Sequence, residues 1–246
     1  MTMANNGRVP TGIEGLDAVI GGLSSGRSVL LIGGPGTGKT VFSIQFAYAC
    51  SQAGLRTYYV ANEEIAEDLR TQAKTFGWDM VTPESSGRLS FVEEAGKRAE
   101  EVESAISLRI HSRKTDPRQI LADLPDDAEA LIIDSLGSHA ANLTIQDFRD
   151  RFDYLVFELR RRSVTTLIVL DEETSEGFLN FALYPVHGAI RLEKRDNPYT
   201  GRRERVMDII KMRNCGSPIQ PLPFDITSTG LHLLPAAQGL GGKARG

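Results

Sequence analysis

The sequence predicts an α/β fold in which a mostly parallel central sheet, flanked by helices, continues into an antiparallel extension. Three observations support this prediction. Short apolar runs alternate with longer segments of helical period, as in a chain of β–α units. Two of the apolar runs, Ala130 to Ile133 and Val164 to Leu170, are uninterrupted, which is typical of strands covered on both faces. After Asp171, strand-like runs follow one another across turns without intervening helices.

The composition indicates a globular protein that needs no cross-links to fold. The chain has 246 residues, of which 41% are hydrophobic and 24% are charged, whereas a disordered chain is much poorer in apolar residues. With 28 Lys and Arg against 32 Asp and Glu, the net charge is −4, which argues against broad electrostatic binding to nucleic acid. Neither of the two cysteines has metal-site spacing, and no apolar run has the length of a signal peptide or membrane span. These features predict a soluble, cytoplasmic protein.

The elements of the parallel half can be assigned in chain order. Aliphatic, β-branched and aromatic runs predict the strands, and apolar residues three to four positions apart predict the helices. Gly54 supplies a left-handed stop to the first long helix. The predicted strands are Ser28–Ile32, Arg56–Ala61, Leu89–Val92, Ala130–Ile133 and Val164–Leu170, and the predicted helices are Lys39–Ala53, Glu63–Phe76, Glu93–Leu108, Pro117–Leu124 and Phe148–Arg162.

The antiparallel extension is predicted from three later runs. They are Ala189–Glu193, Arg205–Met212 and Leu231–Leu234. The turn from Asp196 to Gly201 contains the Asn, Pro and Gly residues that favour a hairpin. Because both halves share one sheet, we expect residues 8–235 to form one domain, with residues 1–7 and 236–246 as flexible tails.

A phosphate-binding loop is the most specific motif. Residues 33–40 read Gly-Gly-Pro-Gly-Thr-Gly-Lys-Thr, a complete G-x-x-x-x-G-K-[ST] match between a predicted strand and a predicted helix. Glycines let successive N–H groups point at phosphate oxygens, and the helix adds its positive end. The alternative, a glycine-rich turn with an exposed lysine, fits these flanks poorly. The predicted nucleotide contacts are Gly34, Pro35, Gly36, Thr37, Gly38, Lys39, Thr40 and Val41, with Lys39 at the β- and γ-phosphates.

The expected partner of the loop is a carboxylate that helps to hold Mg²⁺. The run from Ala130 ends in Asp134, at the tip of a buried strand. The Thr40 hydroxyl and the Asp134 carboxylate are therefore the predicted protein groups around Mg²⁺. The alternative is that Asp134 only caps the next helix.

These residues together resemble the RecA/Rad51 superfamily and, more narrowly, the KaiC-like ATPases. The resemblance covers nearly all of residues 8 to 235 and implies a RecA-like P-loop NTPase fold that binds ATP and Mg²⁺. It is carried by Val9–Asp17, Gly21–Gly26, the phosphate loop, Tyr59–Glu64, the strand ending at Asp134, and Ile210–Arg213.

The resemblance implies the roles of two acidic residues. Glu63 and Glu64 would orient and deprotonate the attacking water, and carboxylates at the carboxyl edge of a parallel sheet do lie in the ligand crevice. Read without the resemblance, both residues fit the first turn of the helix beginning near Glu63, where the helix dipole favours acids.

The resemblance also implies a homo-oligomeric ring, usually a hexamer, with ATP between subunits. Lys211 and Arg213 would reach the γ-phosphate in the neighbouring site, as an arginine finger does. Side chains two apart on a strand share a face, so both can serve one ligand. Composition alone favours two solvated strand charges. The basic run Arg202 to Arg205 is similarly interpreted as a solvated hairpin tip rather than a nucleic-acid contact.

Two departures from the family pattern affect the expected activity. Where many relatives carry small polar residues near the γ-phosphate, this chain has Val169 and Leu170, followed by Asp171. The segment Phe181 to Val186 carries no hydroxyl except that of Tyr184, so serine/threonine autokinase activity is not expected.

Three functions remain open from the sequence. The preferred one is a slow, Mg²⁺-dependent ATPase with a conformational output. The second is a regulatory switch that binds ATP with little hydrolysis, like ATP-binding relatives in the archaellum motor. The third, a recombinase-like DNA-dependent ATPase, is disfavoured by the net charge of −4.

Overall fold

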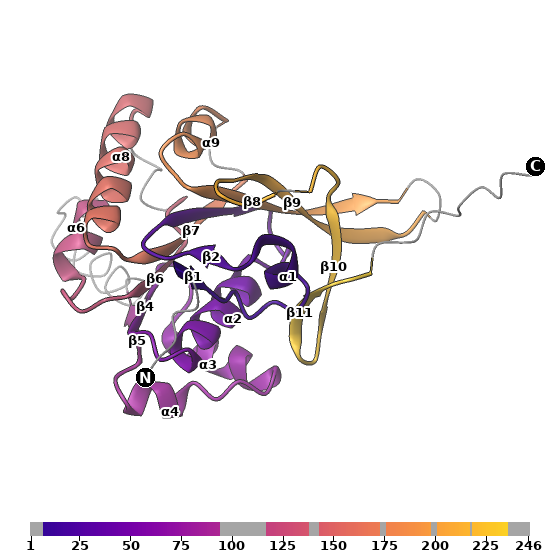
Figure 1. Cartoon of the computed structure of the whole chain (residues 1–246), viewed down its shortest axis with the longest axis horizontal. Helices are drawn as coiled ribbons and strands as arrows, with labels where there is room; N and C mark the ends of the chain where they lie inside the picture. Colours follow the sequence, from indigo (N-terminus) through magenta and orange to yellow (C-terminus); the bar gives the residue numbers. More distant parts are fainter. Residues whose placement is uncertain are drawn as a thin grey trace, which may run out of the picture.

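The computed structural model describes residues 7–93, 117–137, 143–172, 176–197, 201–216 and 218–235. A nine-stranded sheet forms its centre, with the strand order β11-β10-β9-β8-β3-β7-β6-β4-β5 (Figure 1). The predicted helix after Glu93 and the predicted tails lie outside the described residues, except for Gly7.

The predicted α/β fold class is confirmed, including the change from parallel to antiparallel pairing. β8 runs parallel to β3 and antiparallel to β9, so the sheet changes character at that strand. The parallel strands are β3 (Ser28–Gly33), β4 (Thr57–Ala61), β5 (Leu89–Glu93), β6 (Ala130–Asp134), β7 (Thr165–Asp171) and β8 (Gly188–Asp196). The antiparallel strands are β9 (Arg203–Met212), β10 (Leu222–Thr227) and β11 (Gly230–Leu233), of which β10 was not predicted.

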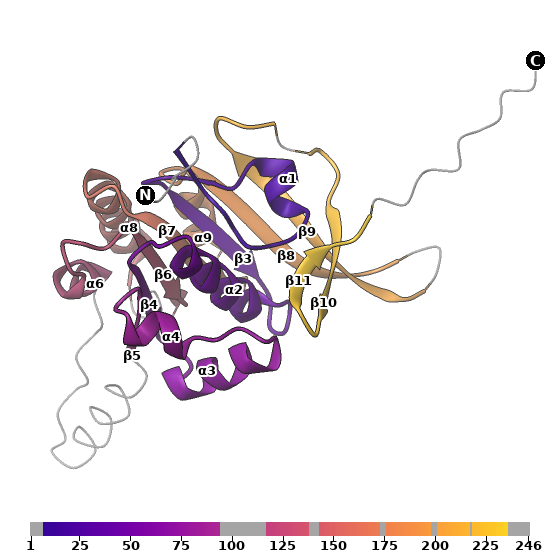
Figure 2. The ribbon, with the colours of Figure 1, turned by 60° about the horizontal axis from the view of Figure 1, so that its bottom comes forward.

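Helices cover both faces of the sheet (Figure 2). Two separate apolar clusters fill the spaces between sheet and helices, one on each face. One face carries α1 (Leu16–Ile20), α2 (Lys39–Gln52), α3 (Ala66–Thr75) and α4 (Val81–Ser85), and the other carries α6 (Pro117–Asp123), α8 (Ile145–Arg161) and α9 (Glu176–Leu183). A small antiparallel pair of β1 (Arg8–Val9) and β2 (Leu23–Ser24), which flank α1 in the chain, completes the first face. No helix in the described part of the chain combines the length and apolarity needed to span a membrane.

The buried helix α2 leads directly out of the phosphate loop. Nine of its residues are buried, so it is apolar around most of its circumference rather than along one stripe. Gly38 precedes it with a φ of 109°, and Gly54 follows with a φ of 85°. Both values lie in the left-handed region that favours glycine, so the sequence positions of these glycines fix where the helix begins and ends.

The helices differ from the prediction in where α3 and α8 begin, with α8 starting at Ile145 rather than Phe148, and in the presence of α1, α4 and α9. The predicted helix beginning at Glu63 starts at Ala66 instead, so Glu63 and Glu64 lie in the segment between β4 and α3. The interpretation of these acids as members of the first helical turn is therefore wrong. Helix α9 was not predicted, because its short apolar run lacks a clear polar face.

Candidate functional site

The carboxyl ends of four neighbouring parallel strands form one row. In the sheet, β3, β7, β6 and β4 are adjacent. Gly33 at the end of β3 pairs with Asp171 on β7, and Asp134 at the end of β6 pairs with Ala61 on β4. The register thus brings the phosphate loop, Asp171, Asp134 and the segment after Ala61 to the same edge, where ligands of open α/β sheets bind.

The loop between β3 and α2 is curled by glycine geometry and by its own hydrogen bonds. Gly36 has a φ of 68°, and the Thr37 hydroxyl donates to the Gly34 carbonyl at 2.9 Å. Gly33 leaves no room for a side chain, because a Cβ there would lie 2.7 Å from the Leu192 carbonyl oxygen. Such a curled loop at a helix N-terminus can direct backbone N–H groups at an anion.

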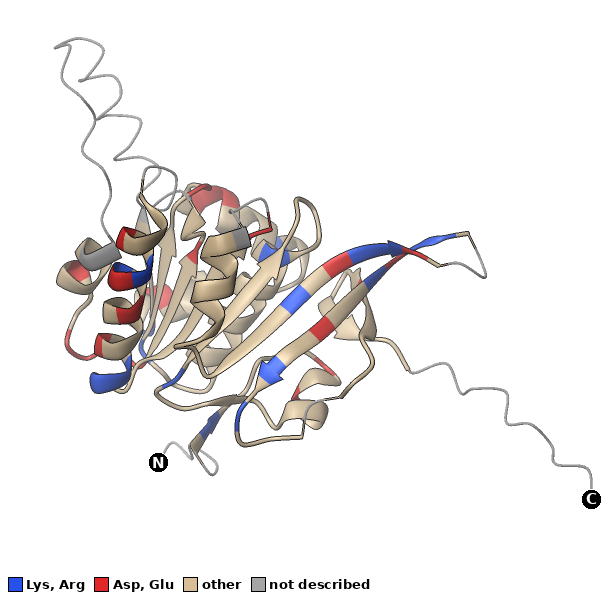
Figure 3. Ribbon diagram, turned by 90° about the horizontal axis from the view of Figure 1, so that it is seen from above, with Lys and Arg blue, Asp and Glu red and all other residues tan. Residues whose placement is uncertain are grey.

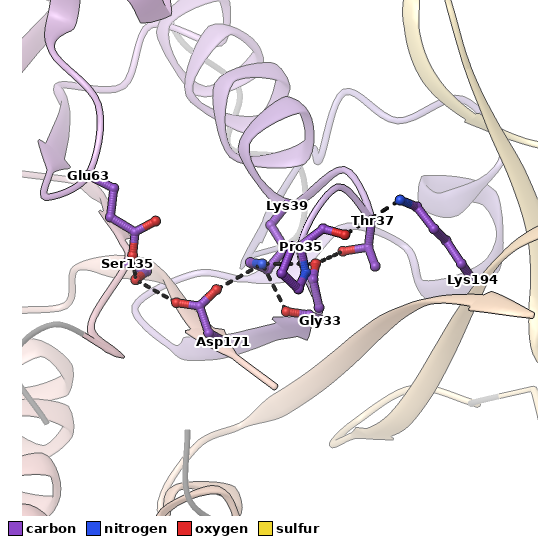
Figure 4. A network of polar contacts seen from close by, with 9 residues as sticks. Gly33, Pro35, Thr37, Lys39, Glu63, Ser135, Asp171 and Lys194 are labelled. Atoms are coloured by element: carbon purple, nitrogen blue, oxygen red, sulfur yellow. Dashed lines mark hydrogen bonds and ion pairs between the residues drawn. The ribbon is translucent and has the colours of Figure 1, made fainter. Parts of the chain in front are cut away.

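Lys39 is held inside the loop. Its ammonium donates to the carbonyl oxygens of Gly33 at 2.8 Å and Gly34 at 3.1 Å. Its Nζ atom also lies 2.9 Å from Oδ1 of Asp171, in an ion pair whose two side chains are 12% and 30% exposed (Figure 4). These acceptors use all three N–H donors of the ammonium group.

Ser135 connects Asp171 with Glu63. Its hydroxyl lies 2.5 Å from Oε1 of Glu63 and 3.1 Å from Oδ2 of Asp171. Asn62, which precedes Glu63, donates from its side-chain amide to the Ser135 carbonyl at 2.7 Å. The polar chain from Glu63 through Ser135 and Asp171 to Lys39 is continuous (Figure 4).

Asp134 lies deeper, in a small cavity shared with other candidate residues. Thr40, Glu63, Glu64 and Asp134 line this cavity together with Tyr59 and Leu69. The Tyr59 hydroxyl donates to Oδ2 of Asp134 at 2.5 Å. Burial raises the pKa of Asp134 to about 7, and this hydrogen bond opposes the shift.

Glu64 lines the same cavity and has a different environment from Glu63. Burial raises its pKa, while a hydrogen bond with Thr40 lowers it and the nearby Asp68 and Glu63 carboxylates raise it further. Glu63 and Glu64 therefore have different partners: Ser135 for the first and Thr40 for the second.

The residues fit a magnesium ion shared with a bound nucleotide. Among the described residues, no three His, Cys, Asp or Glu side chains gather as a complete ligand set. Magnesium bound with nucleotide takes only one or two protein ligands plus phosphate oxygens and waters. The cavity brings the Thr40 hydroxyl and the Asp134 carboxylate together, and a cation there would favour the ionised form of the buried carboxyl group.

Lys211 and Arg213 lie away from this row in the same chain. Lys211 on β9 pairs with Ala189 on β8, and Ala189 pairs with Leu30 on β3. Leu30 lies three positions before Gly33, where the phosphate loop begins. Its ammonium donates to the Leu183 carbonyl, and both cations contact the Tyr184 carbonyl, at 3.4 Å each. Burial and the nearby Arg213 charge lower the pKa of Lys211. Both cations thus bind the carboxyl end of α9 instead of the phosphate loop.

The basic run at the β8–β9 hairpin is balanced by acids. Arg203 lies 3.3 Å from Asp196, and Arg205 lies 3.3 Å from Asp225. Basic and acidic residues are mixed along this hairpin (Figure 3). The arrangement agrees with the interpretation of a solvated hairpin rather than a basic surface for nucleic acid.

Three residues of the site were missed from the sequence. Leu170 was expected to end its strand beside the phosphates, but Val169 and Leu170 are fully buried and Asp171 ends β7. Ser135 follows Asp134, and nothing in its sequence context distinguishes it. Lys194 on β8 approaches the loop, with its Nζ 3.5 Å from the Pro35 carbonyl oxygen. Its distance in sequence from the loop left no pattern by which to find it.

Comparison with known proteins supports the same interpretation. The family described as "ATPase: KaiC" matches residues 9–238. The chain belongs to the KaiC ATPase family. This membership supports nucleotide binding and ATPase activity, and it confirms the resemblance drawn from the motifs.

Several relatives cover nearly the whole chain. A UPF0273 protein of Thermotoga maritima is 30% identical, with 95% of this chain and 98% of the relative aligned. The circadian clock oscillator protein KaiC of Synechococcus elongatus is 31% identical over 96% of this chain, but this alignment covers only 47% of the clock protein. The solved structure of KaiC-like protein PH0186 from Pyrococcus horikoshii has a TM-score of 0.72 at 30% identity, covering 93% of this chain and 99% of that one.

Proposed function

We propose that this protein binds ATP with Mg²⁺ and hydrolyses it slowly at the subunit interfaces of a six-membered ring, with a conformational output. The observation that carries the proposal is the row of strand ends. There Lys39, Thr40, Asp134 and the two acids after β4 converge on one cavity and one loop. Convergence of these groups at the carboxyl edge matches the requirements of phosphoryl transfer to water.

The phosphate loop would bind the phosphates, and the cavity would hold the metal ion. The backbone N–H groups among residues 34–41, other than Pro35, which has none, and the Lys39 ammonium would bind the β- and γ-phosphates, after Lys39 leaves Asp171. Thr40 and Asp134 would hold Mg²⁺, since both line the same cavity. When bound, the metal supplies positive charge that neutralises the phosphate oxygens.

Glu63 and Glu64 would orient the attacking water and accept its proton. Both residues lie in the segment between β4 and α3, outside any helix, and line the cavity next to Thr40 of the loop. The Ser135 hydroxyl fixes Glu63, and Thr40 contacts Glu64, so both carboxylates are oriented by named partners.

A second copy of the chain would complete the site. Lys211 near the end of β9 and Arg213 just beyond it lie on the α9 side of the sheet, with Lys211 level with the middle of β3. A neighbour in a ring would present them to the γ-phosphate, where they would stabilise charge that develops in the transition state. Such heterologous contacts close into a ring when the rotation between copies closes.

One observation favours the alternative of an ATP-binding switch with little hydrolysis. All three donors of Lys39 are engaged within the chain, and the last strand residues before Asp171 are buried and apolar. A site arranged in this way would bind ATP at the cost of breaking its own contacts. The third reading, a DNA-dependent ATPase, has no comparable support from the described surface.

Steady-state ATP hydrolysis with Mg²⁺, measured over a range of protein concentrations, tests the proposal. We expect specific activity to rise with concentration, since subunits must associate to complete each site. The double variant Glu63→Gln, Glu64→Gln should lose turnover while retaining ATP binding. Retained turnover in this variant would refute the role of the acids. ATP binding without hydrolysis at any concentration would establish the switch instead.

A further inference from the structure

Asp171 is a charged residue at the phosphate loop to which the proposed function gives no role. It ends β7 directly opposite Gly33, the first residue of the loop. One carboxylate oxygen pairs with Lys39 at 2.9 Å, and the other lies 3.1 Å from the Ser135 hydroxyl, whose proton it shares with Glu63. Both oxygens are thus used, and the side chain is fixed from two directions (Figure 4).

The contacts of Lys39 leave its ammonium group no donor for a phosphate. Gly33, Gly34 and Asp171 accept its three hydrogen bonds. An N–H donor must come within about 3 Å of a phosphate oxygen to bond it. Lys39 therefore has to leave at least one of these partners when a phosphate arrives, and the charged partner is the one that attracts it most.

Asp171 also acts on the phosphates through its own charge. Its carboxylate lies next to the ammonium that would neutralise them, in a site where Asp134, Glu63 and Glu64 are close by. Both effects oppose the binding of a polyanion: competition for Lys39, and repulsion by an additional negative charge.

We propose that Asp171 is a latch that holds Lys39 in the nucleotide-free chain and thereby sets the affinity of the loop for nucleoside polyphosphates. The latch rests on the proposed function, because it regulates the same site. A loop whose lysine is free in only about one chain in ten binds phosphate about tenfold more weakly than a loop whose lysine is always free. Asp171 thus determines how much ATP is needed to fill the site.

Equilibrium binding of the non-hydrolysable imidodiphosphate analogue of ATP, with Mg²⁺ and measured by calorimetry, tests the latch. Asp171→Asn keeps the shape of the side chain and removes its charge, and Asp171→Ser removes the contact as well. We expect Kd to fall about tenfold in Asp171→Asn and at least as far in Asp171→Ser. Thermal unfolding of each variant checks that it is folded.

Glu172→Gln is the matched control. It removes the same charge from the adjacent, exposed residue, which forms no ion pair with Lys39 within the described residues. Its carboxylate lies beside the loop, since a Cβ on Gly34 would be 3.4 Å from Oε2 of Glu172, so this variant relieves repulsion without altering the Lys39 ion pair. We expect its Kd to fall by no more than about twofold, because this charge is exposed to solvent and salt and does not compete for Lys39. Asp171→Glu retains the charge and should also leave the Kd close to that of the wild type.

The outcomes separate the latch from the proposed function. Tighter binding by the two neutral Asp171 variants, with a gain of no more than about twofold in Glu172→Gln, supports the latch. An equal gain in Glu172→Gln would overturn it in favour of a general charge effect. Unchanged or weaker binding in Asp171→Asn and Asp171→Ser, with a wild type that binds, would overturn the latch alone. Failure of the wild type and all variants to bind would overturn the proposed function together with it.

Discussion

Ser135 is the side chain through which the acids after β4 contact the residues around the loop. It is almost fully buried, and its hydroxyl lies between the carboxylates of Glu63 and Asp171. A serine hydroxyl has one proton to donate and two lone pairs with which to accept. Ionised carboxylates only accept hydrogen bonds, so the single Ser135 proton bonds one of them at a time, and the shorter distance is to Glu63.

Replacing Ser135 by alanine should lower kcat for ATP about tenfold with little change in KM, because Glu63 would lose its orientation while the loop stays intact. Ser135→Thr retains the hydroxyl and should keep most of the activity. Steady-state kinetics of the two variants provide the measurement. An alanine variant with full kcat would show that Glu63 needs no such support.

His187 provides a pH-dependent contribution to stability. It is 7% exposed, and its Nε2 atom has no hydrogen-bond partner among the described residues. Burial lowers its pKa, a bond to the Arg213 backbone opposes the shift, and the charges of Arg27, Arg213 and Arg8 lower the pKa further. The imidazole is therefore kept neutral in the folded chain more strongly than in the unfolded chain.

A lowered pKa in the folded state means that the unfolded chain binds more protons below the ordinary pKa of histidine. The contribution of His187 to stability is thus present above about pH 6.5 and is lost as the pH falls through its folded pKa. Chemical unfolding of wild type and His187→Asn at pH 8 and pH 5 tests this. We expect the wild type to lose more stability than the variant on acidification, and equal losses would contradict it.

At the scale of elements, the junction between the loop and α2 has a strict steric requirement. Gly38 has a φ of 109°, and a Cβ there would lie 2.7 Å from Cδ1 of Ile226 on β10. The start of the helix therefore depends both on a left-handed residue and on a strand near the other end of the sequence. This contact explains why the antiparallel strands matter for the geometry of the phosphate loop.

Gly38→Ala should lower the free energy of unfolding by about 2 to 3 kcal/mol, from backbone strain together with the clash at Ile226. Gly21→Ala is the matched control, since Gly21 has a φ of 73° but an added Cβ there would meet nothing within 4 Å. It should cost only the strain, about 1 kcal/mol. Urea unfolding of the two variants gives both values, and equal costs would remove the steric argument.

At the scale of the whole molecule, the distribution of the candidate residues predicts a shared site. Lys39 belongs to the row of strand ends, whereas Lys211 and Arg213 are bonded to the end of α9. If neighbouring copies complete each site, a chain defective only in one part can be rescued by a chain defective only in the other.

Mixing Lys39→Ala with the double variant Lys211→Ala, Arg213→Ala should therefore restore activity that neither has alone. Random assembly leaves about one quarter of the interfaces with both parts intact, so about one quarter of wild-type hydrolysis is the expected upper level. Each variant mixed with itself is the control. An inactive mixture that still forms mixed rings would argue against the contribution from the neighbour.

The local parts of this protein can be found from the amino-acid sequence alone. The phosphate loop, the glycine that ends α2 and the uninterrupted apolar strands β6 and β7 are encoded in adjacent residues, so propensity and spacing are sufficient to find them. Helix α9 and strand β10 escaped prediction because tertiary packing outweighs their weak local patterns.

Which side chains meet at the site depends on the packing of the whole fold. Asp171, Ser135 and Glu63 lie far apart in the sequence and come together because β7, β6 and β4 are neighbours in the sheet with fixed register. The start of α3 at Ala66 was settled in the same way, leaving Glu63 and Glu64 outside the helix. Local spacing carries information over a few residues, whereas a site made from strand ends depends on strand order, and strand order is set by packing over the whole sheet.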